Sequence, residues 1–272
     1  MKKKRTARSI VEQEEKIVAV TAYDYTTGRL ADDAEIDLVL VGDSLAQVIQ
    51  GKPNTLSVTL DQMVYHCRCV TSGINHSLVV GDMPFLSFHI SIEDTIRAAG
   101  RLIQEGGVDA VKLEGGKKRS AVIKALTDAE IPVLGHIGLT PQSYLTMGGF
   151  RIQGKRTSES QAAFGEQSRN DILSDALAIQ EAGAFAVVVE GVPTLLGEEI
   201  TKSLSIPTIG IGAGPHCRGQ ILVIHDLLGL TKHKPKFAKQ YIDLDGQIVT
   251  ALKTFQHEVR EGSFPDENYC YR

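Results

Sequence analysis

The chain has 272 residues, of which 42% are hydrophobic and 23% charged, and its formal net charge is −4 at pH 7. A chain of this length buries a sizeable core without dividing, so we expect one domain over residues 1–272. Charges of both signs are spread along the sequence, which excludes a basic nucleic-acid-binding face. No stretch reaches membrane-spanning length, and no apolar segment of a signal peptide follows the basic residues 1–5. We therefore expect small-molecule partners, and neither nucleic acid nor a membrane.

The four cysteines bear on the compartment. Cys67, Cys69, Cys217 and Cys270 form no CxxC pair, and their spacing is not that of a disulfide framework. A reduced, cytoplasmic location fits this cysteine usage best.

Eight short apolar runs have the length of a strand, and most are followed by a segment with helical periodicity. They occupy residues 17–24, 37–43, 77–82, 110–115, 131–138, 184–191, 206–214 and 221–226. Thr59 and Gln62 read as a capping box before one helix, and a second helix begins after Ser91. Strands and helices in alternation indicate a sheet of parallel strands.

Internal repeats distinguish between two parallel architectures. Residues 105–115 and 181–191 agree at six of their eleven positions, and the IPVLG of 131–135 recurs as the IPTIG of 206–210. Eight strands from repeating units favour a closed (β/α)8 TIM barrel over an open doubly wound sheet. The open sheet also normally carries a Gly-rich turn after its first strand, which residues 21–28 lack.

Two connections between the predicted strands have unusual lengths. The interval between the last two predicted strands is too short for a full crossover helix, so we expect a short or atypical connection there. A long polar, glycine-containing insertion covers residues 148–170, and we expect a lid over the catalytic mouth from it.

In four of the runs the apolar residues lead to an acidic residue at the last or next-to-last position: Asp43, Asp82, Glu114 and Glu190. Parallel sheets build active sites at the carboxyl ends of their strands, but carboxylates gathered there repel unless a cation lies among them. Two aspartates and a glutamate supply the oxygen ligands that suit Mg²⁺ or Mn²⁺, and no His or Cys cluster with zinc spacing competes. The sequence therefore predicts a magnesium site. For Asp43 taken alone, capping of the next helix is the alternative.

Four further features bear on candidate chemistry. Lys112 lies two positions before Glu114 in one strand, so both side chains point to the same face. Glu190 follows three valines, and an apolar setting raises the pKa of a carboxyl group toward the range that a general base needs. A metal ligand or a helix cap is the alternative role for Glu190. His136 is placed to donate to a carboxylate or to a developing enolate oxygen, or is a structural histidine. The Gly-rich residues 210–219 are compatible with anion binding but lack the Gly-Lys-Ser/Thr of a P-loop.

Taken together, these motifs resemble the ketopantoate hydroxymethyltransferase family. The matching segments run in order from about Val20 to Asp226 and include TAYDY, LVLVGDSL, GDMPF, VKLEGG, GHIGLTPQS, GGFRIQGK, VVEGVP, GIGAG and GQILVIHDLLG. The resemblance implies a barrel of the phosphoenolpyruvate/pyruvate-handling type. It also implies that a hydroxymethyl group passes from 5,10-methylenetetrahydrofolate to 3-methyl-2-oxobutanoate through a magnesium-stabilised enolate, which forms ketopantoate in pantothenate biosynthesis.

The resemblance also implies roles for single residues. One Mg²⁺ per subunit is expected at Asp43, Asp82 and Glu114, and Glu190 matches the proton acceptor. The implied keto acid contacts are Asp43, Ser44, Asp82, Lys112 and His136. A homo-oligomer, a decamer by family precedent, is a further implication.

Two positions depart from the family pattern, and two rival functions stay open. Arg218 and Phe88 replace an acidic residue and a tyrosine that are common in relatives, so the resemblance assigns no folate contacts. A folate-independent, metal-dependent aldolase or lyase uses the same enolate chemistry on the same barrel. A scaffold without catalysis is the second rival, although inward-facing charges are costly to keep for packing alone.

Overall fold

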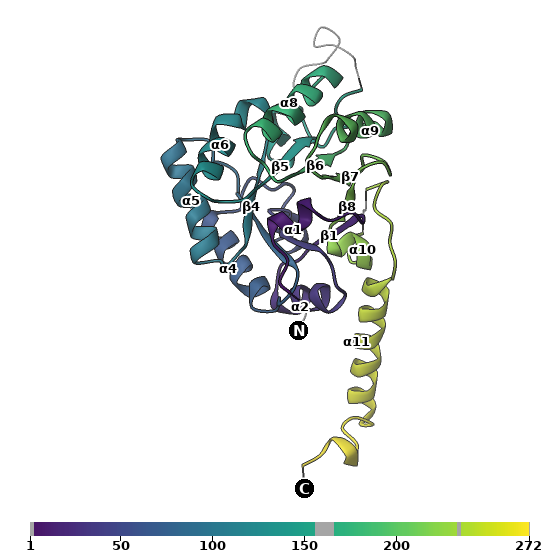
Figure 1. Ribbon diagram of the computed structural model, residues 1–272. Helices are drawn as coiled ribbons and strands as arrows, with labels where there is room; N and C mark the ends of the chain where they lie inside the picture. The colour runs from purple at the N-terminus through teal and green to yellow at the C-terminus, as the bar shows by residue number, and fades with distance from the viewer. Residues whose placement is uncertain (1–2, 156–165, 233–234, 272) are drawn as a thin grey trace. The chain divides into compact units, whose positions relative to one another are not determined.

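The computed structural model describes residues 3–155, 166–232 and 235–271. Eight parallel strands close into a barrel in chain order, each pairing with the next and β8 with β1 (Figure 1). The strands are β1 Ile17–Thr21, β2 Leu38–Val41, β3 Leu78–Asp82, β4 Ala110–Glu114, β5 Val133–Gly138, β6 Ala186–Glu190, β7 Thr208–Ile211 and β8 Gly219–Leu222. The predicted (β/α)8 barrel is confirmed.

Helices cover the outer face of this barrel (Figure 1). The longer ones are α2 Tyr25–Asp33, α4 Leu60–Thr71, α5 Ile92–Gln104, α6 Ser120–Asp128, α8 Arg169–Glu181 and α9 Thr194–Ser203. The shorter ones are α1 Ala7–Val11, α3 Leu45–Val48 and α7 Tyr144–Met147, with the 3₁₀ turns η1 Lys117–Arg119 and η2 Pro141–Ser143. The capping box of Thr59 and Gln62 is present at α4, and Ser91 caps α5 as predicted.

The last connections of the barrel differ from the sequence-based boundaries. The predicted eighth strand at residues 221–226 is wrong in its bounds, because β8 is Gly219–Leu222 and Ile224–Leu228 forms helix α10. An apolar run of this length fits a strand and a buried helix equally well, so periodicity could not separate them. Residues 212–218, all described, link β7 to β8 without a helix, as their short interval predicted.

The interior of the barrel explains where charged side chains can point. Buried apolar residues alternate along each strand with period two and fill the barrel, for example Leu78 and Val80 of β3 or Ala186 and Val188 of β6. Two residues further along each strand, on the same inward face, lie Asp82 in β3 and Glu190 in β6. Charged side chains therefore form the layer above the apolar core, at the carboxyl ends of the strands.

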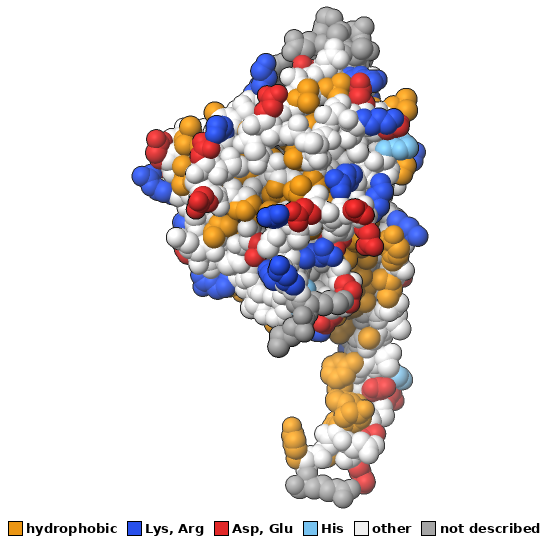
Figure 2. All heavy atoms as spheres, viewed as in Figure 1, with side chains coloured by type: hydrophobic (Ala, Val, Ile, Leu, Met, Phe, Trp, Pro, Cys, Tyr) orange, Lys and Arg blue, Asp and Glu red, His pale blue; other side chains and the backbone are white. Residues whose placement is uncertain are grey.

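Residues Ile224–Arg272 cluster separately from Met1–Val223. In this C-terminal unit, helix α11 spans Leu244–Glu261 and the 3₁₀ turn η4 spans Glu267–Tyr269. None of the residues of α11 is buried, and Figure 2 shows apolar side chains along the helix. A single domain over the whole chain stays a prediction.

Membrane and cysteine expectations can be compared with the described residues. No helix in the described ranges combines the length and apolarity needed to cross a bilayer. All four cysteines carry free thiols, and Cys67 and Cys217 are buried.

Candidate active site

Strand register brings the charged residues of neighbouring strands side by side. Asp82 of β3 pairs with Lys112 of β4, and Glu114 of β4 pairs with His136 of β5. All four side chains are buried, none being more than 5% exposed. Because Lys112 and Glu114 are two residues apart, both extend into the barrel as predicted.

Lys112 is the central cation of the cluster. Its Nζ donates to both carboxylate oxygens of Asp82 at 2.8 Å and lies 3.7 Å from Glu114 Oε1. Burial works to lower the pKa of Lys112, but the surrounding carboxylates of Asp82, Glu114 and Asp43 outweigh it and raise this pKa. Lys112 therefore stays protonated at neutral pH. For its partner Asp82, the effect of burial exceeds that of the ion pair, so the pKa of Asp82 is raised.

His136 lies between two carboxylates. Its Nε2 is 3.1 Å from Glu190 Oε2, and its Nδ1 is 3.6 Å from Glu114 Oε1. Burial and the charge of Lys112 act to lower the pKa of His136, but the two carboxylates outweigh them and raise it to about 9. Burial acts to raise the pKa of Glu114, but the contact with His136 and the charge of Lys112 outweigh it and lower this pKa. The side chain of Glu190 is 17% exposed and lies against the imidazolium of His136. The apolar setting that Val187–Val189 predicted for Glu190 is therefore not what the structure shows.

Asp43 lies two residues after the end of β2, and its side chain points into the cluster. Its backbone N–H donates to Asp82 Oδ2 at 3.2 Å, and its own Oδ2 accepts from Gln142 Nε2 at 2.9 Å. Ser44, not Asp43, occupies the N-cap position of α3, so the helix-cap alternative does not describe the Asp43 side chain. Burial and the charges of Asp82 and Glu114 hold the pKa of Asp43 well above its usual value.

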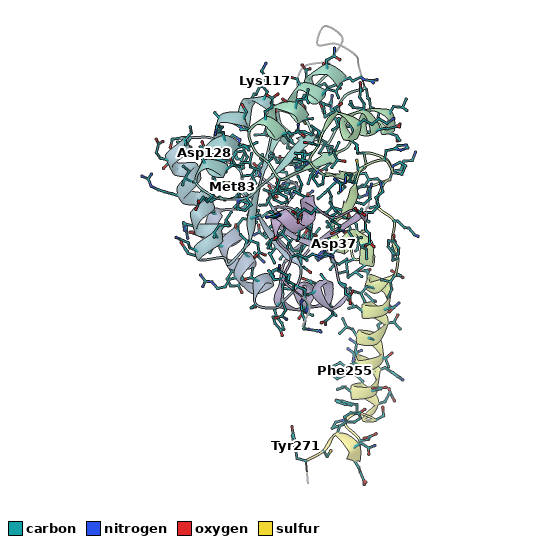
Figure 3. The ribbon with its side chains drawn as sticks, in the orientation of Figure 1. Asp37, Met83, Lys117, Asp128, Phe255 and Tyr271 are labelled. Atoms are coloured by element: carbon teal, nitrogen blue, oxygen red, sulfur yellow. The ribbon has the colours of Figure 1, made fainter. Side chains whose placement is uncertain are left out.

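Two residues that sequence reasoning did not single out complete these contacts. Gln142 in η2 also donates its backbone N–H to Glu114 Oε2 at 2.9 Å and its side-chain amide to the carbonyl of Met83, which is labelled in Figure 3. Tyr23, fully buried, lies with its hydroxyl 2.8 Å from Ser44 Oγ. Tyr23 lies inside the predicted strand 17–24 and Gln142 four positions after the predicted strand 131–138, so their only sequence signal is membership of the TAYDY and GHIGLTPQS segments.

The charge of the cluster bears on the predicted metal. Asp82, Glu114 and Glu190 contact the cationic side chains of Lys112 and His136, and the carboxylate of Asp43 belongs to the same cluster. Two negative charges therefore remain in excess when all six groups are ionised. Glu114 Oε1 is a buried oxygen without a hydrogen-bond donor. Oxygen donors and this charge suit a hard divalent cation. In the described ranges, however, no three His, Cys, Asp or Glu groups are already arranged around one metal position, and the ammonium of Lys112 lies among the carboxylates.

The predicted lid can be followed only at its edges, because residues 156–165 lie outside the described residues. On one side, the backbone N–H of buried Gln153 donates to the carbonyl of Gly191 at 2.9 Å. Gln153 Oε1 accepts from the backbone N–H of Gln167 on the other side, at 2.8 Å. Both edges are thus anchored next to Glu190.

The two departures from the family pattern occupy different ends of the barrel. The backbone carbonyl of Arg218 accepts from the N–H of Ile17, the first residue of β1, so Arg218 lies at the amino ends of the strands. Arg218 therefore lies at the end of the barrel opposite to the charged cluster. Phe88 is buried after β3, with the guanidinium of Arg119 5.5 Å from its ring centroid.

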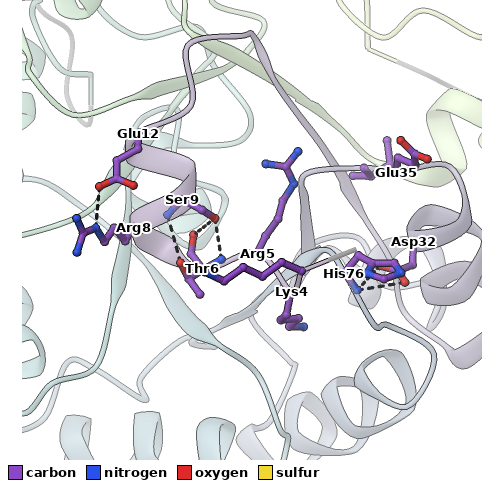
Figure 4. A pocket seen from close by; sticks show the side chains of 11 residues that line it. Lys4, Arg5, Thr6, Arg8, Ser9, Glu12, Asp32, Glu35 and His76 are labelled. Atoms are coloured by element: carbon purple, nitrogen blue, oxygen red, sulfur yellow. Dashed lines mark hydrogen bonds and ion pairs between the residues drawn. The ribbon is translucent and has the colours of Figure 1, made fainter. Parts of the chain in front are cut away.

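A pocket of about 550 Å³ lies away from this cluster, beside α1 and α2 (Figure 4). Lys4 in its wall donates to the carbonyl of Ser77, the residue before β3, which places the pocket at the amino ends of the strands. Lys4 pairs with Asp109 at 2.9 Å and Arg8 with Glu12 at 2.7 Å. These cations are already neutralised, so the charged cluster at the carboxyl ends is the stronger candidate site.

Comparison with known proteins gives the family. A family model described as ketopantoate hydroxymethyltransferase matches residues 2–267. The chain belongs to the ketopantoate hydroxymethyltransferase family. It is 50% identical over 275 aligned positions to the 3-methyl-2-oxobutanoate hydroxymethyltransferase of Geobacter metallireducens, covering 100% of both chains. It is 52% identical to the protein of the same name from Geobacter sulfurreducens, over 94% of this chain and 93% of the other. Membership of this family makes the chain an enzyme, a transferase.

Solved structures agree on the fold. Phosphoenolpyruvate phosphomutase from Streptomyces platensis subsp. rosaceus superposes with a TM-score of 0.63 at 15% identity, over 98% of this chain and 92% of the other. A phosphonopyruvate hydrolase complex with oxalate and Mg²⁺ gives 0.63 at 12% identity, over 97% and 93%. At these identities the likeness shows the fold alone, a closed (β/α)8 barrel.

Proposed function

We propose that this chain forms ketopantoate by transferring a hydroxymethyl group from 5,10-methylenetetrahydrofolate to 3-methyl-2-oxobutanoate. The names and full-length similarity of its relatives support the keto acid and the product. The observation that carries the chemistry is the buried cluster at the barrel mouth, where Lys112 and His136 lie among four carboxylates. A cytoplasmic location and a homodecamer stay predictions, and analytical ultracentrifugation tests the second.

We propose that Mg²⁺ is held by Asp43, Asp82 and Glu114, one ion per subunit. The two excess negative charges, the raised pKa of Asp43 and the lack of a hydrogen-bond donor to Glu114 Oε1 among the described residues support a divalent cation at these oxygens. When bound, the ion supplies positive charge that polarises the keto carbonyl of the substrate. Asp43, Ser44, Asp82, Lys112 and His136 are the proposed keto acid contacts.

Three residues have separate roles in the removal of the substrate proton. Glu190, partly open to solvent at the edge of the cluster, takes the proton from C3 of the keto acid. The protonated His136, 3.1 Å away, orients the carboxylate of Glu190. Lys112 holds a fixed positive charge near the enolate oxygen, in a buried setting where its effect exceeds that in water.

Carbon–carbon bond formation completes the reaction. The electron pair left at C3 attacks the one-carbon unit of the folate, and one water is consumed as ketopantoate and tetrahydrofolate form. The protein supplies orientation and exclusion of water, since the cofactor carries the carbon. The anchored edges of residues 148–170 beside Glu190 support a covering segment at this point.

An assay with single omissions tests this function. Purified protein is incubated with 3-methyl-2-oxobutanoate, Mg²⁺ and 5,10-methylenetetrahydrofolate, and products are followed by NMR and mass spectrometry. We expect ketopantoate only in the complete mixture. Turnover of the keto acid at the same rate without folate favours the aldolase or lyase instead. No product in the complete mixture contradicts the proposal.

A further inference from the structure

Gln142 makes more contacts to the charged cluster than any function assigned so far explains. It lies in η2, directly after β5, and is 5% exposed. Its backbone N–H donates to Glu114 Oε2, and its Nε2 donates to Asp43 Oδ2, both at 2.9 Å. The same Nε2 donates to the carbonyl of Met83 at 2.9 Å. One residue thereby joins the ends of β2, β3 and β4.

Chemistry fixes the orientation of the Gln142 amide. Its NH₂ group has two hydrogens, and the carboxylate of Asp43 and the carbonyl of Met83 accept one each. The flipped amide would direct its oxygen at two other acceptors, which repels. The donor face of Gln142 is therefore committed to Asp43, and Gln142 Oε1 is left buried without a donor.

We infer that Gln142 is a positioning residue, which holds the carboxylate of Asp43 against Asp82 and fixes its distance from Glu114. The position of Asp43 needs such support, because the residue is 3% exposed and like charges on Asp82 and Glu114 act to push its carboxylate out of the cluster. The backbone N–H of Asp43 donates to Asp82, but among the described residues only Gln142 donates a hydrogen bond to the carboxylate of Asp43. The inference rests on the proposed function, in which Asp43 and Glu114 bind a divalent cation.

Side-chain variants separate the two halves of this arrangement. Gln142→Met keeps the length and volume of the side chain and removes both amide donors, while the backbone N–H to Glu114 remains. A hydrogen bond to a buried charge corresponds to roughly a ten- to hundredfold effect. Gln180→Met is the matched control, because the Gln180 side chain also joins separate segments, its Oε1 accepting from the backbone N–H groups of Ser205 and Ile206, but does so before β7, at the amino ends of the strands.

Mn²⁺ affinity, measured by electron paramagnetic resonance and calorimetry on the full chain, is the first test. We expect Gln142→Met to fold and to weaken Mn²⁺ binding about ten- to hundredfold, and Gln180→Met to leave binding unchanged. In an Asp43→Asn background, Gln142→Met should add little, because the two residues act together. Full additivity, or wild-type Mn²⁺ affinity in Gln142→Met, overturns the inference.

A crystal structure of Gln142→Met without metal is the second test, and it does not depend on the proposed function. We expect the Asp43 carboxylate to move away from Asp82 while Glu114 keeps its hydrogen bond to residue 142. An unmoved Asp43 contradicts the inference even if the wild-type protein binds no metal. Absence of Mn²⁺ binding in the wild type would instead count against the proposed metal site alone. If Gln142→Met does not fold, Gln142→Leu replaces it in both measurements.

Discussion

Replacement of Lys112 by methionine is the perturbation whose cost the structure specifies most sharply. The variant keeps the aliphatic stem but removes the ammonium, which is 2.8 Å from Asp82 and only 4% exposed. Breaking a buried ion pair by removing one partner costs about 3–5 kcal/mol, because the remaining charge is left uncompensated. The pKa of Lys112 is raised in the folded state, so its stabilising contribution is fully present below the unfolded pKa and is lost only as pH rises through the folded one. At pH 7 the whole loss should therefore appear.

An exposed ion pair provides the matched control. Lys124 lies 2.6 Å from Asp128, closer than Lys112 lies to Asp82, but both side chains are 62% exposed (Asp128 is labelled in Figure 3). Exposed pairs contribute roughly 0–1 kcal/mol, so Lys124→Met should lower the free energy of unfolding by no more than about 1 kcal/mol. Burial, rather than distance, is predicted to set the difference.

Chemical denaturation at pH 7 and at equal protein concentration measures both variants. We expect Lys112→Met to lose several times as much unfolding free energy as Lys124→Met. Adding Asp82→Asn to Lys112→Met should restore part of the loss, since it removes the stranded carboxylate. Equal losses for Lys112→Met and Lys124→Met would refute the reasoning that burial of charge dominates this site.

Three further predictions concern neighbouring groups. Asp43→Asn should raise the free energy of unfolding of the metal-free protein at pH 7. The pKa of Asp43 is raised in the folded state, so ionisation of this carboxyl destabilises the protein as pH rises, and asparagine cannot ionise. A lower free energy of unfolding in the variant contradicts this electrostatic argument. The same variant should weaken Mg²⁺ binding in calorimetry, with partial rescue by Mn²⁺. His136→Gln should flatten the pH dependence of stability between about 6.5 and 9, where the wild type loses roughly 3 kcal/mol, and parallel curves argue against a protonated His136. Tyr23→Phe removes the contact to Ser44 and should raise KM for the keto acid roughly two- to tenfold at similar stability; an unchanged KM separates Ser44 from the substrate.

Much of the site could be predicted from the sequence because its residues lie on strands. Period-two alternation places Lys112 and Glu114 on one face, and the carboxyl end of a parallel strand fixes which end of the barrel they occupy. Strand order alone cannot give the pairing of Asp82 with Lys112, because register depends on how far neighbouring strands are staggered around the barrel.

Other features depended on contacts that no local pattern carries. Gln142 meets Asp43 across 99 positions of sequence, so its hydrogen bond has no local signature. The surroundings of Glu190 were expected to be apolar from Val187–Val189, but successive strand residues face opposite sides, and the carboxylate meets His136 of the neighbouring strand. The bounds of the last strand were predicted wrongly because the pattern of residues 221–226 fits a strand and a helix equally well.

Exchange of the C3 hydrogen of 3-methyl-2-oxobutanoate in D₂O, followed by NMR with Mg²⁺, tests the central claim that Glu190 removes this proton. Wild-type protein and Glu198→Gln, whose glutamate pairs with Lys202 on the surface, should catalyse exchange. Glu190→Gln should still bind keto acid and Mg²⁺ but exchange roughly 10²- to 10⁴-fold more slowly, the usual contribution of a general base. Exchange at a near-normal rate in Glu190→Gln would contradict the claim, and loss of Mg²⁺ binding instead would place Glu190 among the metal ligands.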